Sequence, residues 1–273
     1  MIFWLSSYPK SGNTWVRTFL ANYLYNNGHE DIFKIMTKIL LFPHKNFFKK
    51  IVNDKDILDN PSSIFQFFIK AQEEYNKDKK LHILKTHNFW GSVNGHNFSD
   101  VKNTCGAIYI VRDPRSIAVS FAHHAKISFG ESIDLLLDEK RYGVGNGHYY
   151  EARSSWKGHL LSWLGSPIPK KILRYEDLKS KPFENFKSIL EFINKLLHKK
   201  IIINDQKIKR ITDLCSFESL KKYEEKQGFP EKLKNEKFFR KGQNDEWKEV
   251  LSNNEIKKIE ESFKSEMKIF QYI

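Results

Sequence analysis

The chain has 273 residues, of which 40% are hydrophobic and 29% are charged, and it holds only 13 Gly and 8 Pro. This composition is typical of a globular protein and excludes a disordered or fibrous chain. Its two cysteines are too few for a disulfide framework or a cysteine-based zinc module. No apolar run approaches the ~20 residues of a membrane span, and the apolar start at residues 2–5 is too short for a signal peptide. We therefore expect one soluble domain, residues 1–273, in the cytoplasm.

The chain is strongly basic, with 46 basic and 33 acidic residues and a formal net charge of +13. Most of the basic residues are lysines spread along the whole chain, which is typical of a solvated surface rather than of a polyanion-binding patch. Three arginines (Arg112, Arg115 and Arg240) lie instead in short segments that also contain Pro, Gly or Ser. These segments are more informative than the total charge.

Short apolar runs alternate with helical patterns along the chain. Strands are predicted at residues 2–6, 81–85, 107–111 and 171–174. Helices are predicted at residues 14–25, 61–75, 114–125, 154–164, 183–197, 205–214 and 217–226. Asn60-Pro61 and Asp113-Pro114 each predict a capped helix start. The segment at residues 30–60 is expected to be irregular, residues 232–248 to form a basic loop, and the apolar stripe Ile256, Ile259, Phe263 and Met267 to mark a last helix.

This alternation predicts an α/β fold with a doubly wound, mostly parallel sheet flanked by helices. In such sheets, ligands bind outside the carboxyl ends of the strands. Most of the segments that carry chemistry in this chain follow such strand ends, and this coincidence is stronger support for a ligand site than any single motif.

The loop after the first strand, residues 8–15, reads YPKSGNTW. Backbone N–H groups at a helix start form an anion site, and the helix dipole favours negative charge there. Gly12 allows the backbone to approach a phosphate closely, Lys10 adds a positive charge, and Ser11 and Thr14 add hydroxyl donors. The loop predicts a P-loop-like phosphate-binding site, with an ordinary strand–turn–helix connection as the alternative.

The loop is not a Walker A motif, because Lys10 precedes the glycine and no earlier glycine is present. The predicted strands end in Lys85, Arg112 and Arg174 rather than in an aspartate that could hold Mg²⁺. A site with cations but without acidic metal ligands suits a phosphate-rich ligand that is handled without a metal.

Two further segments carry cations that suit phosphate. Residues 110–120 read IVRDPRSIAVS, in which Arg112 can form two parallel hydrogen bonds with a phosphate and Ser120 lies two helical turns later on roughly the same side. Residues 239–248 read FRKGQNDEWK, in which two cations precede a glycine. Taken alone, this last segment also fits a solvated basic loop.

Together these segments resemble motifs of the cytosolic-type sulfotransferases, whose donor is 3′-phosphoadenosine 5′-phosphosulfate (PAPS). Residues 8–15 are similar to the family's 5′-phosphosulfate loop, residues 112–120 to its 3′-phosphate motif, and residues 240–248 to its C-terminal motif. Lys85-Thr86-His87 resembles the catalytic strand end, and Tyr175-Glu176-Asp177 resembles a further cofactor contact. The resemblance covers most of the chain, with five motifs in the family's order.

The resemblance implies a sulfotransferase that binds PAPS through these motifs and releases adenosine 3′,5′-bisphosphate. The residues implied at the 5′ end of the donor are Lys10, Ser11, Gly12, Asn13 and Thr14. Those implied at its 3′-phosphate are Arg112, Ser120, Arg240, Lys241 and Gly242. Trp15 and Phe217 are implied beside the adenine, and Tyr175 as a weaker contact.

The acceptor is expected to be a hydroxyl or an amine, which must lose a proton as it attacks. A neutral imidazole suits removal of this proton, and His87 is our candidate for the base. The competing histidines, His123 and His124, are expected to pack on a helix face or line a pocket. Lys10 is expected beside the oxygen that bridges phosphorus and sulfur, and Lys85 is expected to face the sulfonate oxygens. No metal is expected, because fixed cations take its role.

Three features depart from the family pattern. Asn13 stands where the family has a threonine, and Asp245-Glu246 replaces a Gly-Asp pair before Trp247. We expect the second change to alter the local turn but to leave the cations unaffected. The family's dimerisation motif is not legible at residues 249–255, so the oligomeric state is left open.

Two other functions are considered: an ATP-dependent small-molecule kinase of similar fold, and a non-catalytic polyanion-binding protein. The kinase needs Mg²⁺ ligands and a Walker-type lysine, and neither is legible in the sequence. The polyanion binder does not explain a histidine at a strand end or the spacing from Arg112 to Ser120. The expected partner is a small-molecule, glycan or lipid acceptor, and not a nucleic acid. Aromatic residues in the expected acceptor walls suit a phenol, steroid or lipid alcohol, whereas the cations suit an anionic sugar; the walls are residues 30–60, 89–100, 121–150 and 226–239.

Overall fold

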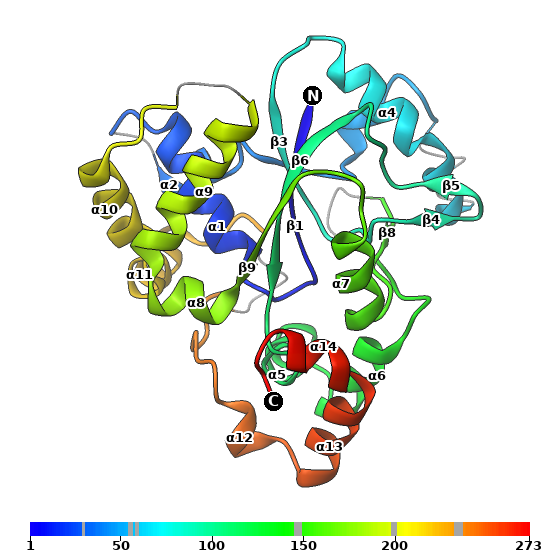
Figure 1. Ribbon diagram of the computed structural model, residues 1–273, viewed down its shortest axis with the longest axis vertical. Coiled ribbons are helices and arrows are strands. Elements are labelled where there is room, and N and C mark those ends of the chain that lie inside the picture. Colours follow the sequence, from blue (N-terminus) through cyan, green and yellow to red (C-terminus); the bar gives the residue numbers. More distant parts are fainter. Residues whose placement is uncertain (29–30, 54–56, 58–59, 145–148, 198–200, 232–236) are drawn as a thin grey trace. The chain divides into compact units, whose positions relative to one another are not determined.

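Five strands form the central sheet of the protein, in the order β2-β3-β1-β6-β9 (Figure 1). Their bounds are Ile2–Ser7 (β1), Leu40–Leu41 (β2), His82–Thr86 (β3), Thr104–Val111 (β6) and Lys170–Arg174 (β9). From β1 the chain adds β2 and β3 on one side and then β6 and β9 on the other. This reversal of strand order at β1 is characteristic of a doubly wound sheet, which confirms the predicted fold class of a mixed α/β protein with a central parallel sheet.

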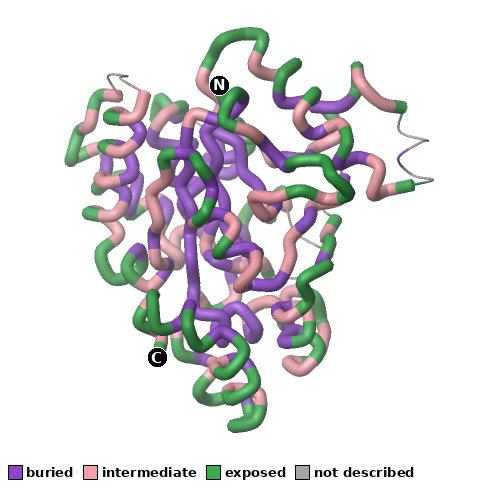
Figure 2. Tube along the Cα trace, turned by 45° about the vertical axis from the view of Figure 1, so that its right-hand side comes forward, coloured by how far each residue is buried: buried purple, intermediate pink, exposed green. Residues whose placement is uncertain are grey.

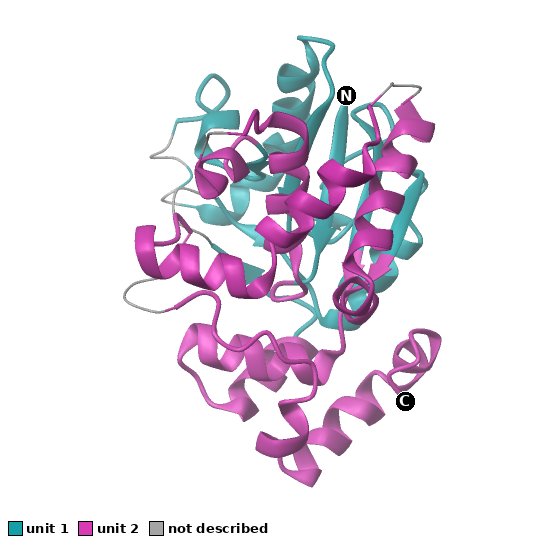
Figure 3. Ribbon diagram, turned by 90° about the vertical axis from the view of Figure 1, so that its left-hand side faces the viewer, with its two compact units in different colours: residues 1–8, 39–109, 138–172 teal, residues 9–38, 110–137, 173–273 magenta. Residues whose placement is uncertain are grey.

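The structure is a computed structural model, and it describes residues 1–28, 31–53, 57, 60–144, 149–197, 201–231 and 237–273. The chain divides into two compact units, shown in separate colours in Figure 3. The first unit comprises residues 1–8, 39–109 and 138–172, and the second comprises residues 9–38, 110–137 and 173–273. The sheet lies in the first unit, except that the last two residues of β6 and of β9 belong to the second.

The first unit holds the carboxyl ends of the two strands that matter most for the site. β1 pairs with β3 in parallel, with Leu5 opposite Lys85 and Ser6 opposite Thr86. The two strands therefore end at the same edge of the sheet. β1 is buried along its whole length, and its neighbours β3 and β6 are mostly buried. Figure 2 shows the buried residues in purple. Trp4 packs against Phe42 and Phe98, with ring centroids 5.5 and 4.9 Å apart, and so anchors an aromatic core.

Smaller elements complete the first unit. They are the 3₁₀ helices η1 (Lys45–Phe47) and η2 (Pro61–Phe67), the helices α4 (Phe68–Asn76) and α7 (Trp156–Leu164), and the two-residue strands β4 (Ser92–Val93), β5 (His96–Asn97), β7 (Tyr142–Gly143) and β8 (Glu151–Ala152).

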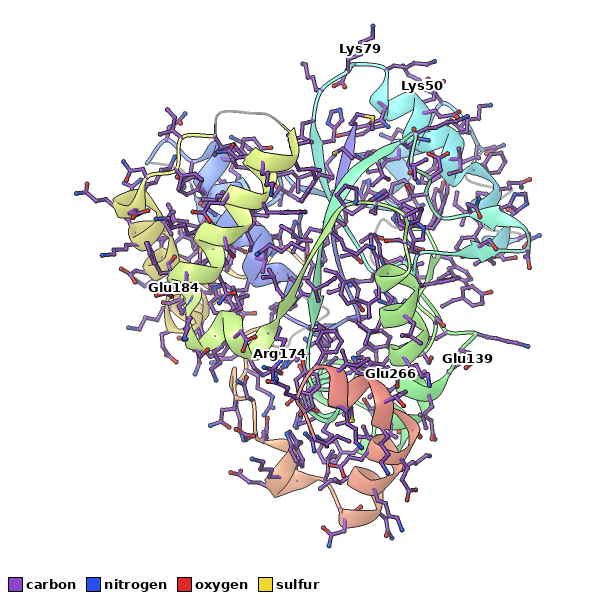
Figure 4. The ribbon with its side chains drawn as sticks, viewed as in Figure 1. Lys50, Lys79, Glu139, Arg174, Glu184 and Glu266 are labelled. Atoms are coloured by element: carbon purple, nitrogen blue, oxygen red, sulfur yellow. The ribbon has the colours of Figure 1, made fainter. Side chains whose placement is uncertain are left out.

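The second unit is mainly helical. Its helices are α1 (Asn13–Tyr25), α2 (Ile32–Met36), α5 (Pro114–Ala125), α6 (Phe129–Leu137), α8 (Tyr175–Ser180), α9 (Pro182–Leu197), α10 (Asp205–Leu214), α11 (Phe217–Gln227), α12 (Trp247–Val250), α13 (Asn253–Ser262) and α14 (Lys264–Ile269). An apolar cluster joins α2 and α11 to the segment before Arg240, with Phe33, Leu220 and Phe239 at its centre. Exposed charged side chains such as Glu184 point away from the unit, whereas Glu266 is buried (Figure 4).

The structure corrects several expectations about local structure. Asn60 makes no side-chain cap, and the helix after it begins as the 3₁₀ helix η2. A helix, α2, occupies part of the segment expected to be irregular, and α6 was not predicted. The last helix breaks at Phe263 into α13 and α14. The cap at Asp113 is confirmed, since its carboxylate accepts the backbone N–H of Arg115 at 2.8 Å. Part of the expected basic loop, residues 232–236, lies outside the described residues.

Candidate active site

The loop after β1 turns into α1 at a glycine that no other residue can replace without strain. Gly12 is the residue before the helix and has φ 94°, in the left-handed region that favours glycine. A Cβ at this position would lie 2.5 Å from a ring carbon of Tyr175. The helix start has no side-chain cap, and the carbonyl of Gly12 accepts the backbone N–H groups of Trp15 and Val16 at 3.0 and 3.3 Å. This is the local geometry of an anion cradle.

Arg112, directly after β6, joins three of the sequence motifs within the second unit. Its guanidinium donates to the backbone carbonyl of Lys10 at 2.9 Å and to that of Gln243 at 3.1 Å. It also stacks over the ring of Tyr175, 4.3 Å from the ring centroid. One buried cation thus links the first loop, the start of α8 and the C-terminal motif.

The C-terminal motif is held by α11 and α8. The ring of Phe217 lies so close to Gly242 that a Cβ there would be 2.6 Å from it. Lys179 donates to the carbonyl of Gly242 at 2.7 Å. On the other side, the buried carboxylate of Glu224 accepts the backbone N–H groups of Phe238 and Phe239, at 2.6 and 2.9 Å. Glu224 was not singled out in the sequence, because nothing in a helical run of charged residues marks the one that turns inward.

The two cations of this motif are paired with a glutamate of the same chain. Glu246 is 8% exposed, and its carboxylate accepts from Arg240 and lies 3.0 Å from the Lys241 ammonium. Burial alone raises the pKa of Glu246, but the two cations outweigh it and the net shift is downward. A carboxylate thus lies against both cations, and their assignment to the 3′-phosphate stays a prediction.

Several buried polar atoms have no hydrogen-bond partner in the part of the chain that the structure describes, and three of them can donate from the loop after β1, the start of α1 and Arg112. They are Ser11 Oγ, Trp15 Nε1 and Arg112 Nε. Buried polar groups are almost always paired, so unsatisfied donors grouped on the predicted donor loop and Arg112 suit a ligand with several acceptor atoms. PAPS, with its phosphates and purine, has such atoms.

The other predicted donor contacts are placed as follows. Trp15 is partly buried and meets Tyr175 and Phe186 edge to face, with centroids 6.2 and 5.6 Å apart. The ammonium of Lys10 lies over the ring of Phe238, 4.7 Å from its centroid. Asn13 and Thr14 are buried in the first turn of α1, and Ser120 is partly exposed in α5. Their roles toward a donor stay predictions.

In the first unit, His87 follows β3 and is held by the end of β1. Its Nδ1 lies 2.7 Å from the carbonyl oxygen of Ser7. A carbonyl can only accept, so Nδ1 carries the proton and Nε2 of the neutral ring keeps its lone pair. Burial lowers the pKa of His87 to about 3, and the charge of Lys85 acts in the same direction. The ring is therefore neutral at physiological pH, the form that a general base requires.

Buried charged side chains surround this histidine. The carboxylate of Glu151 accepts the backbone N–H of His87 at 3.2 Å and pairs with Arg153 at 2.8 Å. Burial raises the pKa of Glu151, but Arg153 and its other positive neighbours lower it further, so the carboxylate stays charged. Lys85 is 7% exposed. Glu151 and Arg153 were not identified in the sequence, because they lie more than 60 residues from His87 and match no motif.

The acid stability of the protein should reflect two buried neutral histidines. Burial lowers the pKa of both His87 and His159 to about 3. Each value lies below the pKa of ~6.5 of an unfolded histidine. At a pH between the folded and the unfolded pKa, each histidine therefore binds a proton in the unfolded state but not in the folded state. We expect the free energy of unfolding to fall by about 1.4 kcal/mol per pH unit and per histidine as the pH drops below 6.5.

Urea denaturation at pH 5.0 to 7.0 measures this slope, and the window stays above the range in which most carboxylates titrate. In His159→Gln, the pH dependence of the free energy of unfolding should be reduced by the contribution of one histidine. Equal slopes in this variant and the wild type contradict the expectation, whereas the same exchange at the exposed His96 should change nothing.

Several aromatic residues expected to line the acceptor site belong to the core instead. Phe33, Phe47 and Phe48 are at most 9% exposed. Tyr142, by contrast, is 45% exposed. His123 contacts the ring of Phe129, as expected for packing on a helix face. Arg115 is buried and forms ion pairs with Asp113 and Glu260.

The fold defines an α/β protein with a central parallel sheet, and the comparisons identify its family. The model of the sulfotransferase domain matches residues 2–271. The chain therefore belongs to the sulfotransferase family and is a sulfotransferase enzyme. This result rejects the two alternative functions considered from the sequence, an ATP-dependent kinase and a non-catalytic polyanion-binding protein.

Relatives and solved structures agree with this assignment. A flavonol sulfotransferase-like protein of Flaveria bidentis is 26% identical, covering 94% of this chain and 78% of its own. Cytosolic sulfotransferase 17 of Arabidopsis thaliana is also 26% identical, covering 96% and 74%. Mouse sulfotransferase SULT7A1 complexed with PAP shares the fold, with a TM-score of 0.64 and 21% identity over 98% of this chain and 84% of that one. Retinol dehydratase with androsterone and PAP gives a TM-score of 0.61 at 18% identity, covering 98% and 80%.

Proposed function

We propose that this enzyme transfers a sulfuryl group from PAPS to a hydroxyl group of a small molecule. The observation that carries the proposal is the junction at Arg112, where the predicted 5′ loop, the predicted 3′-phosphate motif and the C-terminal motif meet around one guanidinium. The glycine-dependent cradle at Gly12 and the unsatisfied donors beside it support a ligand with several anionic groups. The solved relatives that contain PAP support a nucleotide of this kind.

In the proposed reaction, His87 Nε2 takes the proton of the acceptor hydroxyl while its oxygen forms a bond to sulfur. The bond between sulfur and the bridging oxygen breaks, and its electron pair stays on the phosphate oxygen of the departing adenosine 3′,5′-bisphosphate. The products are a sulfate ester, the bisphosphate and a protonated His87. Such transfers proceed through a loose in-line transition state, so positioning and fixed positive charge dominate catalysis. We assign the stabilising charges to Lys10 and Lys85.

We further propose that both units act as one sulfotransferase domain, because the family model spans residues from each of them. A cytoplasmic location is proposed from relatives that are named cytosolic sulfotransferases. No helix in the described part of the chain is long and apolar enough to cross a membrane. Among the described residues, no cluster of His, Cys, Asp and Glu is arranged to hold a metal ion, and metal independence stays a prediction.

Binding of adenosine 3′,5′-bisphosphate to the metal-free protein is the first test. At a concentration 100 times its Kd, a ligand that binds only the folded state stabilises it by about 2.7 kcal/mol. We therefore expect a clear rise in Tm with the bisphosphate in EDTA, and a much smaller one with ATP. Radiolabelled PAPS is then incubated with a panel of flavonols, simple phenols, sterols and sugars, and labelled product is measured. A protein that neither binds the bisphosphate nor labels any acceptor contradicts the proposed function.

A further inference from the structure

His159 is a fully buried histidine that belongs to none of the sequence motifs. It lies on α7 in the first unit and is 0% exposed. Its Nε2 is 3.2 Å from the backbone carbonyl oxygen of His87, and its Nδ1 is 2.9 Å from the hydroxyl of Tyr109. The ring of Tyr8 meets it edge to face, with centroids 5.6 Å apart. A buried imidazole thus connects β6 to the residue proposed as the base.

The partners of His159 determine which of its nitrogens carries the proton. The His87 carbonyl can only accept, so Nε2 is the donor, and Nδ1 of the neutral ring must then accept from the Tyr109 hydroxyl. Burial lowers the pKa of His159 to about 3, which keeps the ring neutral and this tautomer in place. Tyr109 is 1% exposed, so its hydroxyl is buried together with the imidazole that it contacts.

The same face of α7 binds the residues that follow His87. Trp163 Nε1 donates to the carbonyl of Asn88 at 2.9 Å. The hydroxyl of Ser162 accepts the backbone N–H of Trp90, also at 2.9 Å. Residues three and four positions apart on a helix share a face, so α7 holds the segment after β3 at successive positions. His159 is the member of this face that contacts His87 itself.

We propose that His159 is a positioning residue for His87, and this inference rests on the proposed function of His87 as the base. Three contacts fix His87: Glu151 on its N–H, Ser7 on its ring Nδ1, and His159 on its carbonyl. Without the third contact, only Glu151 and Ser7 hold residue 87, so its carbonyl can turn and shift the ring from its observed direction. A displacement of about 1 Å at a reacting group lowers turnover by about 100-fold.

Two amide substitutions that differ in length by one methylene group place their polar atoms at different ring positions, and so test this role against simple packing. The longer amide of glutamine places an N–H near the position of Nε2, so His159→Gln keeps a donor for the His87 carbonyl. The shorter amide of asparagine lies near the position of Nδ1. His159→Asn therefore keeps an acceptor for the Tyr109 hydroxyl but loses the donor to the His87 carbonyl. With PAPS and the best phenol of the acceptor panel, we expect kcat to fall 10- to 100-fold in His159→Asn and less than fivefold in His159→Gln. KM for PAPS should stay within twofold in both.

Two further measurements keep the test decisive if His159→Asn folds poorly. Tyr109→Phe removes the donor that orients His159 and should lower kcat by a smaller factor, whereas His96→Asn on the exposed strand β5 serves as the matched control. Bisphosphate-induced stabilisation reports whether each variant is folded. In ¹⁵N-histidine NMR spectra, His87 should be protonated on Nδ1 in the wild type and should become a tautomer mixture in His159→Asn.

The outcomes distinguish the inference from the function it rests on. An inactive wild type with the expected His87 tautomer contradicts the proposed function but leaves the positioning contact in place. An active wild type whose kcat and His87 tautomer are unchanged in both His159→Asn and Tyr109→Phe overturns the positioning role. Equal losses in His159→Gln and His159→Asn also overturn it, because packing alone would then account for the effect.

Discussion

Replacing His87 with alanine is expected to lower kcat by about 10²- to 10⁴-fold, the usual contribution of a general base. The physical reason is the tautomer that Ser7 selects: with Nδ1 donating to a carbonyl at 2.7 Å, Nε2 has a lone pair and no proton. Because burial lowers the pKa of His87 to about 3, this form persists throughout the physiological range. Alanine removes the acceptor for the proton while leaving the predicted donor cations in place.

The measurement is steady-state sulfuryl transfer together with bisphosphate titration. Binding of adenosine 3′,5′-bisphosphate should stay within twofold of the wild type, since its predicted contacts lie in other segments. Added imidazole should restore part of the activity of His87→Ala by supplying the missing base. His96→Ala, an exposed histidine on β5, is the control. Wild-type turnover in His87→Ala refutes the role of this residue, and a loss of bisphosphate binding would indicate a structural role instead.

The elements predicted from sequence are those whose signal is local. The strands around Ile2–Ser7 and Thr104–Val111 are continuous apolar runs bounded by polar residues, so their burial could be predicted from composition alone. The helix after Asp113 was predicted because a capping carboxylate and a proline are adjacent in the chain. By contrast, Asn60 has the same signature without capping, because its side chain bonds to the hydroxyl of Ser62 instead.

The missed residues act through contacts between distant parts of the chain. His159 lies 72 positions from His87, and Glu224 lies 15 positions before Phe239, whose N–H it accepts. Neither spacing is periodic, and a buried histidine or glutamate looks like a surface residue in a sequence. Such positioning side chains satisfy backbone groups rather than a ligand, so no ligand motif includes them. Contiguous motifs therefore indicate candidate ligand contacts, whereas the side chains that support those segments are found only in the structure.

Glu246→Gln is expected to tighten binding of adenosine 3′,5′-bisphosphate by about tenfold, which corresponds to about 1.4 kcal/mol. Glu246 pairs with both Arg240 and Lys241, the two cations that we assign to the 3′-phosphate. A phosphate that binds them must compete with this carboxylate, and hydrogen bonds to charged groups contribute about 1.5–3 kcal/mol. The gain is smaller than that range because the Lys241 side chain is 48% exposed and is screened by solvent. Glutamine keeps the size of the side chain but removes its charge.

A matched control separates this local competition from a general change of charge. Glu249→Gln removes the same charge three residues later from an exposed side chain, and it should leave the affinity within twofold. Isothermal titration of the bisphosphate at constant ionic strength gives both values. Weaker binding in Glu246→Gln would mean that the carboxylate orients the two cations for the nucleotide rather than opposing it, and the competition would then be rejected. Equal affinities in the two variants would place the 3′-phosphate away from Arg240 and Lys241.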